Sequence, residues 1–149
     1  MNTPAPGREL TSDEVALREL LRPLKRVAVL GIKTEAQSDQ PAFYVPSYLA
    51  SAGVEVVPVP VYYPEVTTIL GRPVYRSVAA VPGPVELVDV FRRPADLMAH
   101  LDDLLAARPR VVWLQTGIRH PEFCDALRAA GIDVVQDRCL MVEHRRLAR

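Results

Sequence analysis

The chain has 149 residues and a mass of 16.5 kDa, which fits one ordinary domain with a hydrophobic core. Hydrophobic residues make up 49% of it, which excludes a disordered protein, and 18 Lys and Arg balance 18 Asp and Glu, so no overall charge attracts nucleic acid. Because no apolar run has the length of a signal-peptide core or a membrane span, and two cysteines are too few for a disulfide framework, we expect a cytoplasmic protein that binds neither membrane nor nucleic acid.

The first part of the chain is expected to be a flexible arm over residues 1–10, followed by one domain over residues 11–149. Thr11 and Glu14 have the spacing of a capping box, in which each side chain bonds a free backbone N–H at a helix start. We therefore predict a helix over residues 12–22, packed outside the main sheet. The leucines of its apolar face recur at helical spacing: Leu17, Leu20, Leu21 and Leu24.

Five short apolar runs, most of them separated by helix-like stretches, predict a Rossmann-like α/β fold with a doubly wound parallel sheet. The predicted strands are Val27–Leu30, Val54–Val59, Val85–Val90, Val111–Leu114 and Ile132–Val135. The predicted helices between them begin at Pro41, Pro94 and Pro121. Residues 60–84 are rich in proline and predict a long surface loop with a short extended piece near Val74 and Tyr75. Numbered in chain order, the strands are predicted to lie 3-2-1-4-5.

Polar residues follow each strand, and in a parallel sheet these strand ends gather at the edge where such sheets bind ligands. Glycine in the first turn lets a backbone approach a diphosphate, an aromatic ring can cover a flat base, and arginine pairs bidentately with phosphate. The candidates from this reasoning are Gly31, Ile32, Lys33, Thr34 and Pro41 after the first strand, Phe91, Arg92 and Arg93 after the third, and Gln115 and Gly117 after the fourth. The alternatives are an ordinary strand-to-helix loop and a buried Phe91 beside two solvated arginines.

Metal and catalytic sites are weakly indicated. His120, Cys124, Cys139 and His144 could together hold zinc, but neither half has the tight C-x-x-C spacing of a zinc signature. A Cys139–His144 nucleophile pair lacks an orienting partner, and no serine stands in a G-x-S-x-G motif. We therefore expect no metal and no catalytic residues.

Five segments of the chain occur together in a characteristic order: the glycine turn at Gly31, Phe43–Leu49, Val85–Arg93, Val112–Glu122 and Asp137–His144. Together they resemble the small stand-alone CoA-binding proteins, and the similarity runs from about Leu24 to Leu147. These proteins are similar to the CoA-binding domain of succinyl-CoA synthetase and related acyl-CoA synthetases.

The resemblance implies a Rossmann-like fold that binds coenzyme A by its nucleotide end. It places the diphosphate near Gly31–Thr34, and the nucleotide near the Phe91-Arg92 turn and the end of the second strand, at Val59 and Pro60. It does not imply an enzyme, because in the synthetases other domains supply the phosphorylated histidine. The expected function is therefore non-catalytic binding of coenzyme A or an acyl-CoA.

Two departures from the family pattern bear on the ligand. Gln40 stands where the family usually has arginine, and Pro60 stands where it usually has asparagine. The alternatives are therefore a regulator that binds NAD(H) or another adenine nucleotide, and a degenerate module that serves protein contacts. An NAD site usually has an acid at the end of the second strand, but the first acid here is Glu65, so CoA is expected to bind more tightly than NAD.

Overall fold

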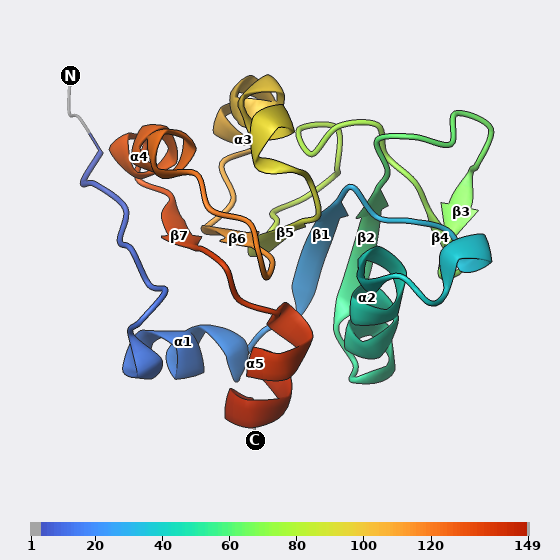
Figure 1. The fold of residues 1–149 in the computed structure, drawn as a ribbon, viewed down its shortest axis with the longest axis horizontal. Helices are drawn as coiled ribbons and strands as arrows, with labels where there is room; N and C mark the ends of the chain where they lie inside the picture. Colours follow the sequence, from blue (N-terminus) through green and yellow to red (C-terminus); the bar gives the residue numbers. More distant parts are fainter. Residues whose placement is uncertain (1–3, 149) are drawn as a thin grey trace.

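Five parallel strands form the central sheet of the computed structural model, which describes residues 4–148 (Figure 1). These strands are β1 (Arg26–Leu30), β2 (Glu55–Val59), β5 (Leu87–Val90), β6 (Val111–Leu114) and β7 (Asp133–Val135). The helices are α1 (Glu14–Leu21), α2 (Pro41–Ser51), α3 (Leu101–Ala107), α4 (Pro121–Ala129) and α5 (Leu140–Leu147), with 3₁₀ helices η1 (Glu35–Gln37) and η2 (Pro94–His100). The predicted Rossmann-like α/β class is confirmed.

The strand order is β2-β1-β5-β6-β7, so the predicted order 3-2-1-4-5 is wrong. The third strand, β5, pairs with β1 in the register Val27↔Leu87 to Leu30↔Val90 and does not lie outside β2. Pro58 explains the arrangement: its carbonyl accepts a bond from the Tyr75 N–H on the side away from β1, where a further strand would need the N–H that proline lacks. A strand with a proline in its middle belongs at an edge. The chain therefore adds β2 on one side of β1 and the later strands on the other side, so the strand order reverses between β1 and β5.

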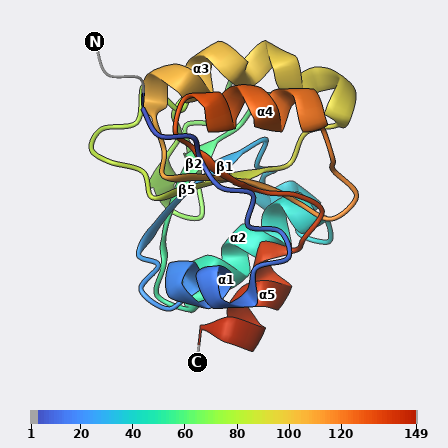
Figure 2. The ribbon, with the colours of Figure 1, turned by 90° about the vertical axis from the view of Figure 1, so that its left-hand side faces the viewer.

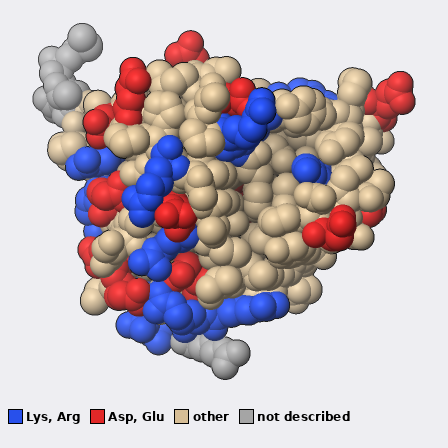
Figure 3. Space-filling view, viewed as in Figure 1, with Lys and Arg blue, Asp and Glu red and all other residues tan. Residues whose placement is uncertain are grey.

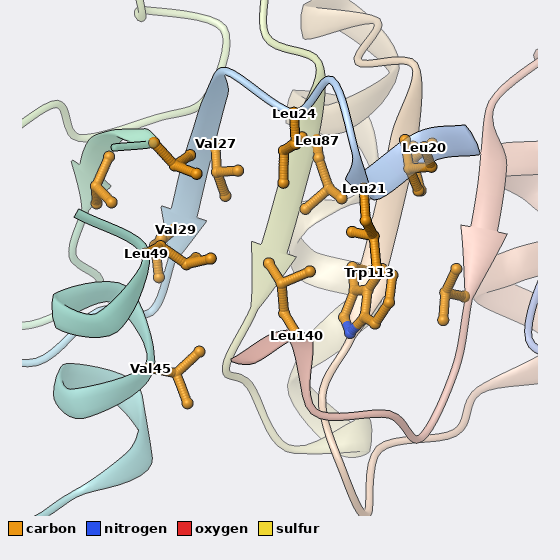
Figure 4. Close-up of a cluster of buried hydrophobic side chains, with 14 of the residues drawn as sticks. Leu20, Leu21, Leu24, Val27, Val29, Val45, Leu49, Leu87, Trp113 and Leu140 are labelled. Atoms are coloured by element: carbon orange, nitrogen blue, oxygen red, sulfur yellow. The ribbon is translucent and has the colours of Figure 1, made fainter. Parts of the chain in front are cut away.

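Helices cover both faces of the sheet. Figure 2 shows α1, α2 and α5 on one face and α3 with α4 on the other. On the first face, Leu21 of α1 and Leu140 of α5 lie beside Trp113 of β6, and all three side chains are fully buried (Figure 4). The Trp113 indole N–H donates to the Arg138 carbonyl at 2.7 Å, which fixes the chain just before α5.

The N-terminal segment differs from the expected arm. Residues 7–10 run beside β7, where the Val134 N–H donates to the Arg8 carbonyl and the Leu10 N–H donates to the Val134 carbonyl. Residues 1–3 of the expected arm lie outside the described residues. The predicted capping box is also wrong: Asp13 caps α1 by accepting from the Ala16 N–H at 3.0 Å.

All four leucines of the predicted helical face are buried, but Leu24 follows the end of α1, so the face of the helix itself carries Leu17, Leu20 and Leu21. Thr11 is drawn away from the helix start because its hydroxyl donates to Glu9 and accepts from the Gln136 N–H.

Residues 60–84 form a loop without a helix that leads from the end of β2 to the start of β1, where the Arg26 guanidinium donates to the Pro84 carbonyl at 2.9 Å. The loop contains a two-stranded hairpin, β3 (Thr68–Ile69) and β4 (Arg72–Pro73), close to the predicted extended piece. The Arg76 guanidinium holds the loop by donating to three backbone carbonyls, those of Tyr62, Tyr63 and Val66. The loop therefore has a defined shape where it passes the candidate site.

The basic end of the chain packs against the body of the protein. Arg146 pairs with Glu14 of α1 at 2.7 Å, and Arg145 lies over the Tyr48 ring of α2 at 4.8 Å. Arg149 lies outside the described residues. Figure 3, in the same view as Figure 1, shows Lys and Arg side chains along the bottom of the molecule, where α5 ends, with acidic side chains among them. Within residues 4–148, no helix is both long and apolar enough to cross a bilayer.

Candidate functional site

A cleft of about 770 Å³ opens at the carboxyl ends of β1, β5 and β6, between the N-terminal ends of α2 and α5. This is the point where the strand order reverses, which is where open α/β sheets bind ligands. The lining residues are Lys33, Gln40, Pro41, Ala42, Tyr44, Phe91, Arg92, Arg93, Pro94, Gln115, Thr116, Gly117, Ile118, Cys139, Met141 and Val142. They include three cations and no carboxylate, and most of the others are apolar. The cleft is therefore suited to an anion with an apolar part.

The turn after β1 lies directly against the turn after β5. Gly31 has φ +85°, and a Cβ at this position would overlap the carbonyl oxygen of Phe91. The Phe91 N–H donates to the Leu30 carbonyl at 2.9 Å, so the two turns form one continuous floor. Glycine is needed here both for its backbone conformation and for this close approach.

A proline inside α2 ties this turn to the helix. Because Pro46 has no N–H, the carbonyl of Ala42 four residues earlier has no partner within the helix. That carbonyl accepts from the Lys33 N–H at 3.1 Å instead. The Lys33 ammonium then lies 3.5 Å from the Gln40 side-chain oxygen at the start of α2, so a positive charge stands beside the helix N-terminus.

The two arginines after β5 have different environments. The Arg92 side chain is only 14% exposed, whereas that of Arg93 is 81% exposed. Arg92 Nε bonds to the ring of His100 at 3.1 Å, and Arg92 Nη1 donates to the Tyr62 hydroxyl at 3.3 Å. Arg93 pairs with Asp96 at 3.0 Å on the protein surface. Arg92 is therefore the arginine that the structure holds in one orientation.

The turn after β6 connects the cleft to α5. The Gln115 side chain is buried and its oxygen accepts from the Leu140 N–H at 3.0 Å, which starts α5. Gly117 has φ +83°, and its N–H donates to Asp137 at 2.6 Å. That bond, followed by the charge of Arg119, lowers the pKa of Asp137.

A second cavity of about 330 Å³ adjoins the cleft, and the two share Thr116, Cys139 and Val142. The carboxyl edge of the sheet is therefore hollow from the turn after β1 to the start of α5.

Seven of the twelve residues predicted from the sequence line the cleft: Lys33, Pro41, Phe91, Arg92, Arg93, Gln115 and Gly117. The other five, Gly31, Ile32, Thr34, Val59 and Pro60, do not line the cleft. Ile32, Val59 and Pro60 are buried, Gly31 packs under Phe91, and Thr34 caps η1.

The wall formed by Tyr44, Ile118, Met141 and Val142 was not predicted. The spacing of Tyr44 three residues after Pro41 puts it on the same side of α2 and could have indicated it. Met141 and Val142 carried no such signal, because the helix starting at Leu140 was not predicted and only the tertiary fold brings it to α2.

The zinc alternative finds no support in the described part of the chain, where no three His, Cys, Asp or Glu side chains come together as a metal site. His120 Nδ1 accepts from the Phe123 N–H and so caps α4. Burial raises the pKa of the Cys124 thiol to about 12, which disfavours the thiolate that binds metal. His144 Nδ1 is bonded to the Tyr48 hydroxyl at 2.8 Å.

Comparison with known proteins agrees with this architecture. Residues 25–145 match the family described as CoA binding domain. The Bacillus subtilis (strain 168) protein YneT is 30% identical over 128 residues, which cover 86% of this chain and 91% of YneT. The Thermus thermophilus protein cell-free ID.343 has a TM-score of 0.83 at 47% identity, covering 91% of this chain and 98% of its own. A hypothetical protein from Pyrococcus horikoshii OT3 has a TM-score of 0.82 at 31% identity, covering 95% of this chain and 97% of its own.

Proposed function

Because the chain belongs to the CoA binding domain family, we propose that it binds coenzyme A, or an acyl-CoA, in the cleft at the carboxyl edge of its sheet. The diphosphate lies at the turn of Gly31–Thr34 and the N-terminus of α2, where Lys33 supplies positive charge. The nucleotide lies near the Phe91-Arg92 turn and the end of β2. The protein acts as a binding module and not as an enzyme.

The observation that carries this proposal is the charge distribution of the cleft. Lys33, Arg92 and Arg93 line it without any carboxylate, while Phe91, Tyr44 and other apolar side chains supply the rest of its surface. CoA has three phosphate groups at one end and an uncharged pantetheine arm at the other. Its charged and uncharged parts therefore correspond to the cationic and apolar parts of the cleft. Family membership and this division together support CoA over an uncharged ligand.

NAD(H) is the second candidate, and the end of β2 argues against it. The first acid after that strand, Glu65, is exposed in the proline-rich loop, whereas a typical NAD site uses an acid at the strand end itself to bond the ribose hydroxyls. Gln40 stands where the family usually has an arginine, so Lys33 is the cation that remains for the phosphate at this turn. The affinity for CoA is therefore expected to be lower than is usual for the family. The degenerate module remains the reading if neither ligand binds.

The compartment and the domain limits are also part of this proposal. Both cysteines, Cys124 and Cys139, are free thiols, which suits a reducing cytoplasm. Residues 11–149 are taken as the binding domain, and residues 7–10 run along β7.

Titration calorimetry with CoA and with NAD tests the proposal. We expect CoA to bind more tightly than NAD. The Arg92→Ala variant should bind CoA about ten- to a hundredfold more weakly, because a charge-assisted contact to phosphate is worth about 1.5–3 kcal/mol.

Arg93→Ala is the matched control, since it removes the same charge from the adjacent, exposed position. We expect it to change the affinity less than Arg92→Ala. Equal effects would show that net charge and not an oriented contact is responsible, tighter binding of NAD would favour the dinucleotide regulator, and no heat from either ligand would favour the degenerate module.

A further inference from the structure

The guanidinium of Arg92 is held by three side chains that come from two other segments of the chain. Tyr62 belongs to the loop after β2, and its ring centre lies 5.5 Å from the guanidinium carbon as well as offering its hydroxyl. Asp96, inside η2, lies 3.8 Å from Arg92 Nη2, and His100, the last residue of η2, meets Arg92 Nε at 3.1 Å. A guanidinium has five N–H donors, so these contacts leave donors free to bind an anion in the cleft.

The contact between Arg92 and His100 requires a neutral imidazole. Arginine is always protonated and has no acceptor, so His100 Nε2 must accept through its lone pair and the ring proton must be on Nδ1. Protonation of His100 would place two N–H donors and two positive charges against each other at this distance. Either Arg92 or His100 must then move.

The surroundings keep His100 neutral near pH 7. Its pKa is lowered from 6.5 first by burial and then by the charge of Arg92, against the opposing charges of Asp103 and Asp96. Among the described residues, the Tyr62 hydroxyl also contacts Arg92, and Arg93 shares the Asp96 carboxylate with it. Acidification therefore adds a proton to His100, while Arg92 stays protonated throughout.

We propose that His100 is a positioning residue for the ligand: its neutral imidazole aims Arg92 into the cleft, and protonation of His100 weakens binding of the ligand's phosphate. This inference rests on the proposed function, because it takes the anion bound by Arg92 to be a CoA phosphate. It adds a pH-sensitive element to the site, built from a residue outside the cleft lining.

Two variants at one position separate this role from simple packing. Glutamine places its side-chain oxygen at nearly the same reach as His Nε2 and accepts a hydrogen bond at every pH, whereas alanine removes the acceptor. We expect His100→Gln to bind CoA at pH 8 within about threefold of the parent protein, and His100→Ala to bind about tenfold more weakly. In the Arg92→Ala background, His100→Ala should have no further effect.

The pH profile of CoA affinity, measured by calorimetry from pH 8 to pH 5.5, is the deciding readout. The CoA phosphate monoester itself titrates near pH 6, and the His100→Gln variant corrects for this because it binds the same ligand. The pKa of His100 is lowered from 6.5, so we expect the affinity of the parent protein to fall more than that of His100→Gln towards the acid end of this range. Equal slopes for the two proteins, down to the pH at which NMR shows the His100 ring to be protonated, would overturn the proposal.

The coupling can also be measured without CoA. The titration of the His100 ring, followed by NMR in the free protein, should move to higher pH in the Arg92→Ala variant because the opposing charge has been removed. An unchanged midpoint would overturn the proposed pairing of His100 with Arg92. If this coupling is found but CoA does not bind, the proposed function fails, and the proposal that His100 positions Arg92 for a CoA phosphate fails with it.

Discussion

Replacing Gly31 by alanine should destabilise the protein by about 2–5 kcal/mol and abolish most of its CoA binding. Two effects add: a left-handed backbone costs an alanine about 1–2 kcal/mol, and overpacking costs about 1–3 kcal/mol. The new methyl group would overlap the Phe91 carbonyl and come 3.3 Å from Arg92 Cδ. The turn that carries Arg92 must then shift, so stability and ligand affinity fall together. Urea unfolding and calorimetry with CoA measure the two losses.

Gly53→Ala is the matched control for this change. Gly53 has φ +91°, close to the value at Gly31, but a Cβ there would meet no atom within 4 Å. Its variant should lose only the backbone part, about 1–2 kcal/mol, and should bind CoA as the parent protein does. If both variants lose the same stability and neither loses affinity, the contact between the two turns has no role in binding.

The strands and most helices could be predicted from local sequence patterns. Which strands lie next to each other depended on Pro58, and hydrophobic periodicity gives no information about that. Apolar runs and proline-started helices predicted all five strands of the main sheet and most of its helices. The order failed because β2 was placed inside the sheet, although Pro58 in its middle argues for an edge. The start of α1 failed for a similar reason: Thr11 and Asp13 can both cap a helix, and the tertiary contact of Thr11 with Gln136 decides between them.

The candidate site divides in the same way. Residues in the turns after strands could be predicted, because a parallel sheet brings all such turns to one edge. That principle gives no information on which turn residues face outward, so Ile32 and Val59 were included although both are buried. The contribution of α5 and of Tyr62 depends on how distant segments pack, and the pairing of Arg92 with His100 could not be derived from spacing alone.

A buried carboxyl in the middle of β5 should make the stability of this protein fall as the pH rises. Asp89 is fully buried between Val29 of β1 and Trp113 of β6 in the sheet register, and neither of its oxygens has a hydrogen-bond partner within residues 4–148. Burial raises the pKa of Asp89 well above 3.8. The folded protein therefore keeps this carboxyl protonated at pH values where the unfolded chain has already released the proton.

The direction of the effect follows from proton binding. Well below pH 4 the Asp89 carboxyl is protonated in both the folded and the unfolded protein, so its ionisation does not affect stability. As the pH rises towards the folded-state pKa, the unfolded chain is favoured by about 1.4 kcal/mol per pH unit, and above that pKa the difference stays constant.

Asp89→Asn cannot ionise, so the free energy of unfolding of this variant minus that of the parent should increase with pH in this window at that slope. Urea unfolding at several pH values measures it. Asp39→Asn, at an exposed position, is the control and should give no such slope. A flat difference for Asp89→Asn would mean that the carboxyl is ionised in the folded protein and has a partner.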